Sequence, residues 1–238
     1  MAVVVRSRFY PQIALVLALF VFIGFSRSYY FRFLTDLPPM VTLVHLHGLV
    51  FTGWLVLFAV QTRLIAAHRV DLHMKLGVAG LVLAVCIVAL GVATVFHTAA
   101  VPRVRASGLT PPQFAVVPLV GITMFALFVA LGAAFRRRAG VHKRLMVLAM
   151  IAVVGPAVGR LLLLFDVAAL APLMQPLVAA VFITWCLLHD WRKYHRVHPV
   201  FAVGGLAIVA SWPLRTLIAR SEWWQPIGEW IARQGAAV

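Results

Sequence analysis

Long apolar runs separated by short polar segments make up most of the chain. A membrane-spanning helix needs about 20 mostly apolar residues, and seven segments meet this length. They cover about residues 11–31, 40–62, 75–97, 113–135, 145–166, 169–189 and 199–219. The pattern predicts an all-α fold, an integral membrane bundle of seven transmembrane helices within residues 1–220.

A short internal repeat predicts how these helices are connected. Residues 72–76 (LHMKL) open the third span, and residues 141–145 (VHKRL) open the fifth in the same way. Because short loops make consecutive helices antiparallel neighbours, we expect three helical hairpins and one extra N-terminal helix. Residues 221–238 contain three tryptophans, and we expect this tail to lie in the outer membrane interface.

The composition excludes a water-soluble protein. Hydrophobic residues make up 63% of the 238 residues, charged residues 11%, and the mean hydropathy is +1.01. Average soluble domains are roughly 45–50% apolar and about 25% charged. The net charge of +15 would suggest nucleic acid in a soluble chain, but in a polytopic chain it sets topology. We therefore expect the lipid bilayer as partner, and no nucleic acid.

The distribution of Lys and Arg predicts the orientation. With seven spans, the side of the N-terminus carries 13 of these residues and the opposite side carries 8. The first side has Arg6, Arg8, Arg63, Arg69, Lys75, Arg136, Arg137, Arg138, Lys143, Arg144, Arg192, Lys193 and Arg196, and the second has Arg27, Arg32, Arg103, Arg105, Arg160, Arg215, Arg220 and Arg233. The positive-inside rule then predicts a cytoplasmic N-terminus.

Ionisable residues inside the spans indicate a candidate site. The helical rise places His45 and His47 about 8–10 Å below the outer boundary, and Arg160 about 8 Å below it. His97 lies at the rim of the same layer. Intramembrane ionisable residues usually face a protein interior or a wet cavity, so this layer is where we expect a ligand.

The histidines of this layer are candidate haem ligands. His47 and His97, on adjacent helices, are expected to act as axial metal ligands, with Arg160 contacting a propionate or another anion. His45 cannot share a metal with His47 on a regular helix, because residues two apart point about 200° from each other. The layer is equally suited to a quinone headgroup or an anionic lipid.

A second histidine pair is expected at the cytoplasmic face. His73 and His142 occupy equivalent positions of two hairpins, and we expect them to form a second cofactor-binding pair. Two bis-His layers are the arrangement of a transmembrane electron carrier. The alternative is that they belong to a basic rim that attracts anionic lipid and sets orientation.

These residues also carry a resemblance. His47-Gly48, Trp54, Gln61 and the His73-to-Gly77 stretch, together with His142-Lys-Arg-Leu-Met, resemble a group of uncharacterised bacterial multi-pass inner-membrane proteins over roughly residues 20–165. The resemblance implies a location in the bacterial inner membrane and no settled activity. The paired histidines are more loosely similar to membrane b-type cytochromes, although His73 and His97 lie at helix ends here.

Three functions remain open from the sequence. The first is electron transfer with haem or a related redox ligand. The second is transport or binding of a small anionic or lipid-like ligand, with Arg160 beside the helix kink expected at Gly155-Pro156. The third is a non-catalytic subunit or assembly factor that binds other membrane subunits. The HExxH and GxSxG motifs are absent, and the catalytic residues of any enzyme are unknown.

Overall fold

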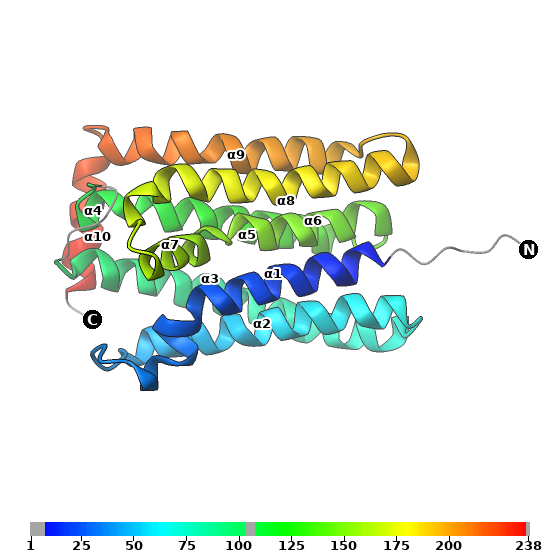
Figure 1. The fold of residues 1–238 in the computed structure, drawn as a ribbon, viewed down its shortest axis with the longest axis horizontal. Helices are drawn as coiled ribbons and strands as arrows, with labels where there is room; N and C mark the ends of the chain where they lie inside the picture. The colour runs from blue at the N-terminus through cyan, green and yellow to red at the C-terminus, as the bar shows by residue number, and fades with distance from the viewer. Residues whose placement is uncertain (1–7, 103–107, 237–238) are drawn as a thin grey trace, which may run out of the picture.

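The computed structural model describes residues 8–102 and 108–236 as a bundle of long antiparallel helices (Figure 1). The main helices are α1 (Phe9–Phe25), α2 (Thr42–Ala66), α3 (Val70–Ala100), α5 (Val116–Ala134), α6 (Ala139–Ala152), α7 (Gly155–Leu164), α8 (Ala171–Tyr194) and α9 (Pro199–Arg220). Shorter elements are the π-helical turn η1 (Ser26–Tyr30), the 3-10 turns η2 (Arg32–Leu34) and η3 (Ala168–Leu170), α4 (Pro111–Phe114) and α10 (Trp224–Gly235).

Within the described residues, seven helical segments are long and apolar enough to cross a membrane. The expected all-α bundle is confirmed, and the protein is a multi-pass membrane protein by this criterion. The third segment is longer than predicted, at 70–100, and the sixth runs over 168–194. Arg6, Arg103 and Arg105, which enter the charge balance, lie outside the described residues.

The three hairpins form as expected. α2 packs against α3, α5 against α6, and α8 against α9, while α1 packs against α2, α6 and α7. α6 lies at the centre, since every residue from Val147 to Ala152 is buried. Large apolar side chains such as Val78 and Leu206 are instead exposed on the outside of the bundle, as expected for a surface that faces lipid.

The fifth span is broken into two helices. α6 ends at Ala152 and α7 begins at Gly155. Pro156 has no N–H to donate to the carbonyl four residues earlier, and its ring clashes with that carbonyl. The kink expected from Gly155-Pro156 is therefore an interruption of the helix in this structure.

The two ends of the bundle differ in charge. We call the end that holds the connections 67–69, 135–138 and 195–198 the basic end. The Trp-rich helix α10 lies across the opposite end, against α3 and α4 (Figure 1). α10 buries Trp224 and Ile231 and exposes Trp223 and Trp230.

Candidate functional site

His45 and His47 take different environments, as the helical geometry of α2 predicts. His45 is exposed, and its ring lies 5.6 Å from the ring of Tyr29. The Tyr29 hydroxyl donates a hydrogen bond of 3.1 Å to the backbone carbonyl of His45. His47 is half-buried and stacks against Phe51, and its Nδ1 is buried without a hydrogen-bond partner.

His47 and His97 lie at different levels of the bundle. His47 faces Gly91 of α3, where an added Cβ would come 3.5 Å from its Cε1. His97 follows Gly91 by six residues, which is about 9 Å along the helix axis. Two axial ligands must reach one iron, and this offset does not favour His47 and His97 as such a pair.

Arg160 approaches His47, as expected from the sequence. It is half-buried on α7, and its guanidinium lies 4.1 Å from the ring centre of Phe25. It donates a hydrogen bond of 3.2 Å to the carbonyl of Pro156, and it is close enough to His47 for an electrostatic interaction. The structure therefore brings His47 and Arg160 into one region, while His97 lies about two turns further along α3 than the residue that His47 faces.

His73 and His142 come together near the basic end. Their ring centres are 6.1 Å apart, with the rings almost perpendicular. His142 Nδ1 lies 2.8 Å from the Gly132 carbonyl, which can only accept, so the Nε2 of a neutral His142 carries the free lone pair. Gln61 donates a hydrogen bond of 3.2 Å to the carbonyl of His73.

Two neighbouring polar atoms at this pair lack partners. His73 Nδ1 and Gln61 Oε1 are both buried without a hydrogen bond. Across the described ranges, 8–102 and 108–236, no group of three or more His, Cys, Asp or Glu side chains could hold a metal ion. The unpartnered atoms of His73 and Gln61, together with the free Nε2 of His142, offer two imidazoles and one amide oxygen to a ligand.

A buried ion pair links α6 to α8, and it is not among the sites predicted from the sequence. Arg144 and Asp190 are 4% and 0% exposed. The guanidinium donates two hydrogen bonds to the carboxylate, of 2.8 Å from Nε and 2.6 Å from Nη2. Its Nη1 donates to the Gly140 carbonyl at 2.7 Å, and the backbone N–H of His198 donates to Asp190 at 3.3 Å.

One signal in the sequence could have revealed this pair. Asp190 is one of only six acidic residues, and it follows the apolar run that ends at Leu188. A carboxylate at the end of a membrane-spanning run usually pairs with a cation inside the bundle. The sequence offers several cations at this end, so identifying Arg144 as the partner required the structure.

A second buried arginine, Arg215 of α9, has no acidic partner within residues 8–102 and 108–236. Its side chain is 3% exposed, and no carboxylate of the described residues lies within ion-pair distance of it. It donates hydrogen bonds to neutral acceptors, the Val117 carbonyl at 3.3 Å and Ser211 Oγ at 3.0 Å. Its Nε is buried without a partner.

Arg215 lines a small cavity beside the break in the fifth span. The cavity has a volume of about 40 Å³, and Gln175 and Trp212 also line it. The guanidinium lies 4.2 Å from the Trp212 ring, whose indole N–H is buried without a partner. Gln175 donates to the carbonyl of Gly155, the first residue of α7, and Trp212 packs directly against that glycine.

A cavity of this size holds a few waters or one small anion, since one water needs about 10–15 Å³ measured in this way. In the sequence, Arg215 lies four residues from the end of its predicted span and Arg160 lies six from the end of its own, so Arg160 is the arginine that the sequence favours as a site residue. The structure shows Arg215 to be the more deeply buried of the two.

The comparisons with known proteins supply no relative. No protein-family model, no curated protein and no solved structure matches this chain. The resemblances drawn from the histidine motifs therefore stay expectations, and the geometry of these sites is what points to a function.

Proposed function

We propose that the protein binds a small anion, or the anionic group of a lipid-like molecule, in the half of the bundle opposite the basic end. Arg215 is the main contact in this proposal. The observation that carries it is a buried guanidinium whose hydrogen-bond acceptors are neutral and which has no acidic partner in the described part of the chain.

The energetic cost of burying this charge supports the proposal. An arginine does not lose its proton in proteins, so it cannot become neutral as a buried lysine does. The effective penalty for burying one ion is several kcal/mol after relaxation and water penetration. An anion in the neighbouring cavity would offset that penalty, and the two unpartnered N–H groups of Arg215 and Trp212 are donors that an anion can accept from.

The break in the fifth span adds a second favourable element. A helix N-terminus carries a partial positive charge and unpaired N–H groups, and α7 begins at Gly155 against Trp212. Interrupted membrane helices commonly form the binding sites of transporters. Arg160, on the same short helix, is a second cation in this half of the bundle.

The cellular location is part of the same proposal. We place the protein in the bacterial inner membrane with the basic end in the cytoplasm. The excess of Lys and Arg at the basic end supports this orientation. The site near Arg215 then lies in the outer half of the membrane, with α10 across its outer end.

Thermal unfolding of the purified protein in detergent tests the proposal. Chloride, bromide and acetate are each titrated against gluconate at equal ionic strength, and dodecanoate represents a lipid-like anion. A ligand at one hundred times its Kd stabilises the folded state by about 2.7 kcal/mol. We expect at least one of these anions to raise the apparent Tm, and the size of the effective anion identifies the ligand class.

Two variants of the same helix make the test specific. Arg215→Gln should abolish the anion-dependent rise in Tm, whereas Arg220→Gln, at an exposed arginine of α9, should retain it. An identical response of both variants would contradict the proposal, because the rise would then come from general screening of charge.

Haem binding is the second candidate function, and among the candidate histidines only the His73–His142 pair favours it. The rings of His73 on α3 and His142 on α6 lie 6.1 Å apart, and the hydrogen bond from His142 Nδ1 to Gly132 orients its ring as such bonds orient metal-ligating histidines. Bound haem would supply one-electron redox chemistry. A reduced-minus-oxidised spectrum of the purified protein with no Soret and alpha bands would exclude this candidate.

A further inference from the structure

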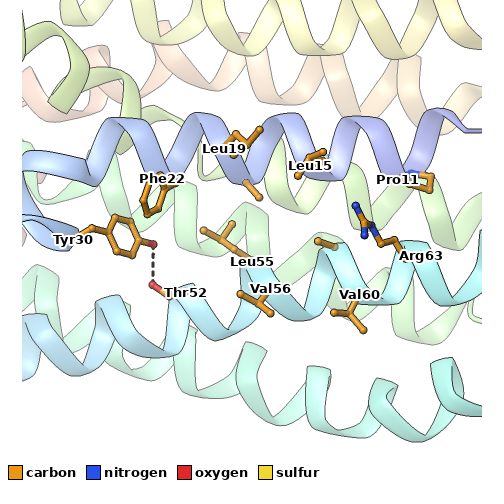
Figure 2. Close-up of a pocket in the computed structure, with 12 residues that line it drawn as sticks. Pro11, Leu15, Leu19, Phe22, Tyr30, Thr52, Leu55, Val56, Val60 and Arg63 are labelled. Carbon is orange, nitrogen blue, oxygen red and sulfur yellow. Dashed lines mark hydrogen bonds between the residues drawn. The ribbon is translucent and has the colours of Figure 1, made fainter.

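An apolar groove runs along the outside of the bundle between α1 and α2. It has a volume of about 370 Å³, and Figure 2 shows its lining side chains on the two facing helices. Leu15 and Leu19 of α1 face Leu55 and Val56 of α2 across it. The walls are therefore suited to a hydrocarbon chain.

The length of the groove matches one leaflet of a membrane. It extends on α2 from Thr52 to Arg63, which is eleven residues or about 16 Å at the helical rise. The hydrocarbon core of a bilayer is about 30 Å thick, so one leaflet contributes about half of that. A single acyl chain entering at one end of the groove would reach the middle of the membrane at the other.

The end of the groove at Arg63 is cationic. Arg63 is exposed near the basic end, and its guanidinium points from α2 toward α1 at the mouth of the groove (Figure 2). Its side chain makes no hydrogen bond or ion pair with any described residue. A phosphate at headgroup depth is the group that this arginine would bind.

At the other end of the groove, the described lining side chains Tyr30 and Thr52 have no free donor. Thr52 donates its hydroxyl proton to the Gly48 carbonyl at 2.7 Å, so Tyr30 donates its own to Thr52 Oγ1 at 2.9 Å. Both protons are committed. A quinone headgroup, whose carbonyls only accept hydrogen bonds, would find no donor here, whereas a hydrocarbon terminus needs none.

We propose that this groove binds an anionic phospholipid from the leaflet at the basic end. One acyl chain lies between α1 and α2, and the phosphate contacts Arg63. This site is about one leaflet away from Arg215 and uses other helices, so it stands or fails independently of the anion site proposed above.

Native mass spectrometry of the protein released from nanodiscs tests this site. The nanodiscs contain equal amounts of phosphatidylglycerol and phosphatidylcholine with identical acyl chains. We expect one retained phosphatidylglycerol per protein. Arg63→Gln should lower its retention about fivefold, the effect of one arginine near an anionic surface, while Arg137→Gln, an exposed arginine of the same end, should not.

A second pair of variants tests the acyl-chain path without changing charge. Ala59 lines the groove, so Ala59→Phe should reduce lipid retention, whereas Ala130→Phe on the exposed surface of α5 should leave it unchanged. Equal retention of the two lipids, or equal losses in Arg63→Gln and Arg137→Gln, would overturn the proposal. Retention of an isoprenoid quinone in place of phospholipid would overturn it as well.

Discussion

Two buried arginines in this bundle are compensated in opposite ways. Arg144 meets the carboxylate of Asp190 with two hydrogen bonds and donates a third to Gly140. Arg215 is equally buried, yet among the described residues its oxygen acceptors are one carbonyl and one hydroxyl. The comparison separates a cation that the protein neutralises itself from one that is left for another molecule to neutralise.

The surroundings of the two arginines reinforce this difference. The aromatic rings of Tyr194 and Phe201 flank the Arg144 guanidinium at 5.6 and 5.5 Å, and Asp190 also accepts the His198 N–H. All of these groups lie where α6, α8 and α9 meet. Arg215 instead lines a cavity next to an interrupted helix, which is where a bundle can adjust to a ligand.

The largest effect is expected when the Arg144–Asp190 pair is broken on one side. Asp190→Asn would leave a buried guanidinium without its counter-charge, and removal of one partner of a buried pair typically costs 3–5 kcal/mol. We expect a loss of about that size in the free energy of unfolding, measured by denaturant unfolding in detergent micelles. Arg136→Gln, at an exposed position of the same end, is the control and should change it little.

The double variant Arg144→Leu/Asp190→Leu makes this test more specific. Replacement of a whole buried pair by apolar residues is often neutral or stabilising, so the double variant should recover most of what Asp190→Asn loses. If the single and double variants were equally unstable, hydrogen bonds to Gly140 and His198 would matter more than the charge pair, and the contrast with Arg215 would be lost.

The opposite sign is expected at Arg215. Arg215→Leu removes an uncompensated charge from the interior, so in gluconate, without an anion that binds, it should raise the free energy of unfolding. We expect a gain of about 1–3 kcal/mol, by analogy with apolar replacement of buried ions, together with loss of the anion response. A loss of stability as large as that of Asp190→Asn would show that Arg215 is a structural group, like Arg144.

The sequence predicted the fold because apolar run length alone determines where a helix can span a membrane. It also predicted the meeting of His73 with His142, since the repeat places them at equivalent hairpin positions. At Gly155-Pro156 it predicted a kink, since proline cannot complete the helical ladder, and the structure has a full interruption there. These features depend on local sequence or on the order of the hairpins.

The sequence could not determine which side of a helix faces the interior. The spans are apolar on all sides, so periodicity does not distinguish a lipid face from a protein face. Arg215 and Asp190 therefore looked like residues of the helix ends, and only the packing of α9 against α5 and of α8 against α6 places them in the interior. The position of His97 along the bundle axis relative to His47 likewise depends on how α2 packs against α3, which the sequence does not show.

The smallest expected effect is a pH dependence at the Arg144 end. His198 precedes α9 and accepts the Val200 N–H through its neutral Nδ1 at 3.2 Å. Burial and the nearby Arg144 lower the pKa of His198, while Asp190 opposes this shift. Protonation is then easier in the unfolded state, whose histidine has a pKa of about 6.5, so this stability is present above pH 6.5 and is lost as the pH falls below it.

His198→Asn separates this titration from the other histidines. Asparagine can still cap the helix, and the loss of a cap typically costs about 1 kcal/mol, which sets the scale of the effect. Between pH 7.5 and 5.5 the free energy of unfolding of wild type should fall more than that of His198→Asn. In an Asp190→Asn background the contribution of His198 should grow, because the carboxylate no longer opposes Arg144. If His198→Asn changed the pH dependence of the free energy of unfolding equally in the wild-type and Asp190→Asn backgrounds, the pKa of His198 would not depend on the buried pair. Arg144 would then have no electrostatic effect on the loop beside it.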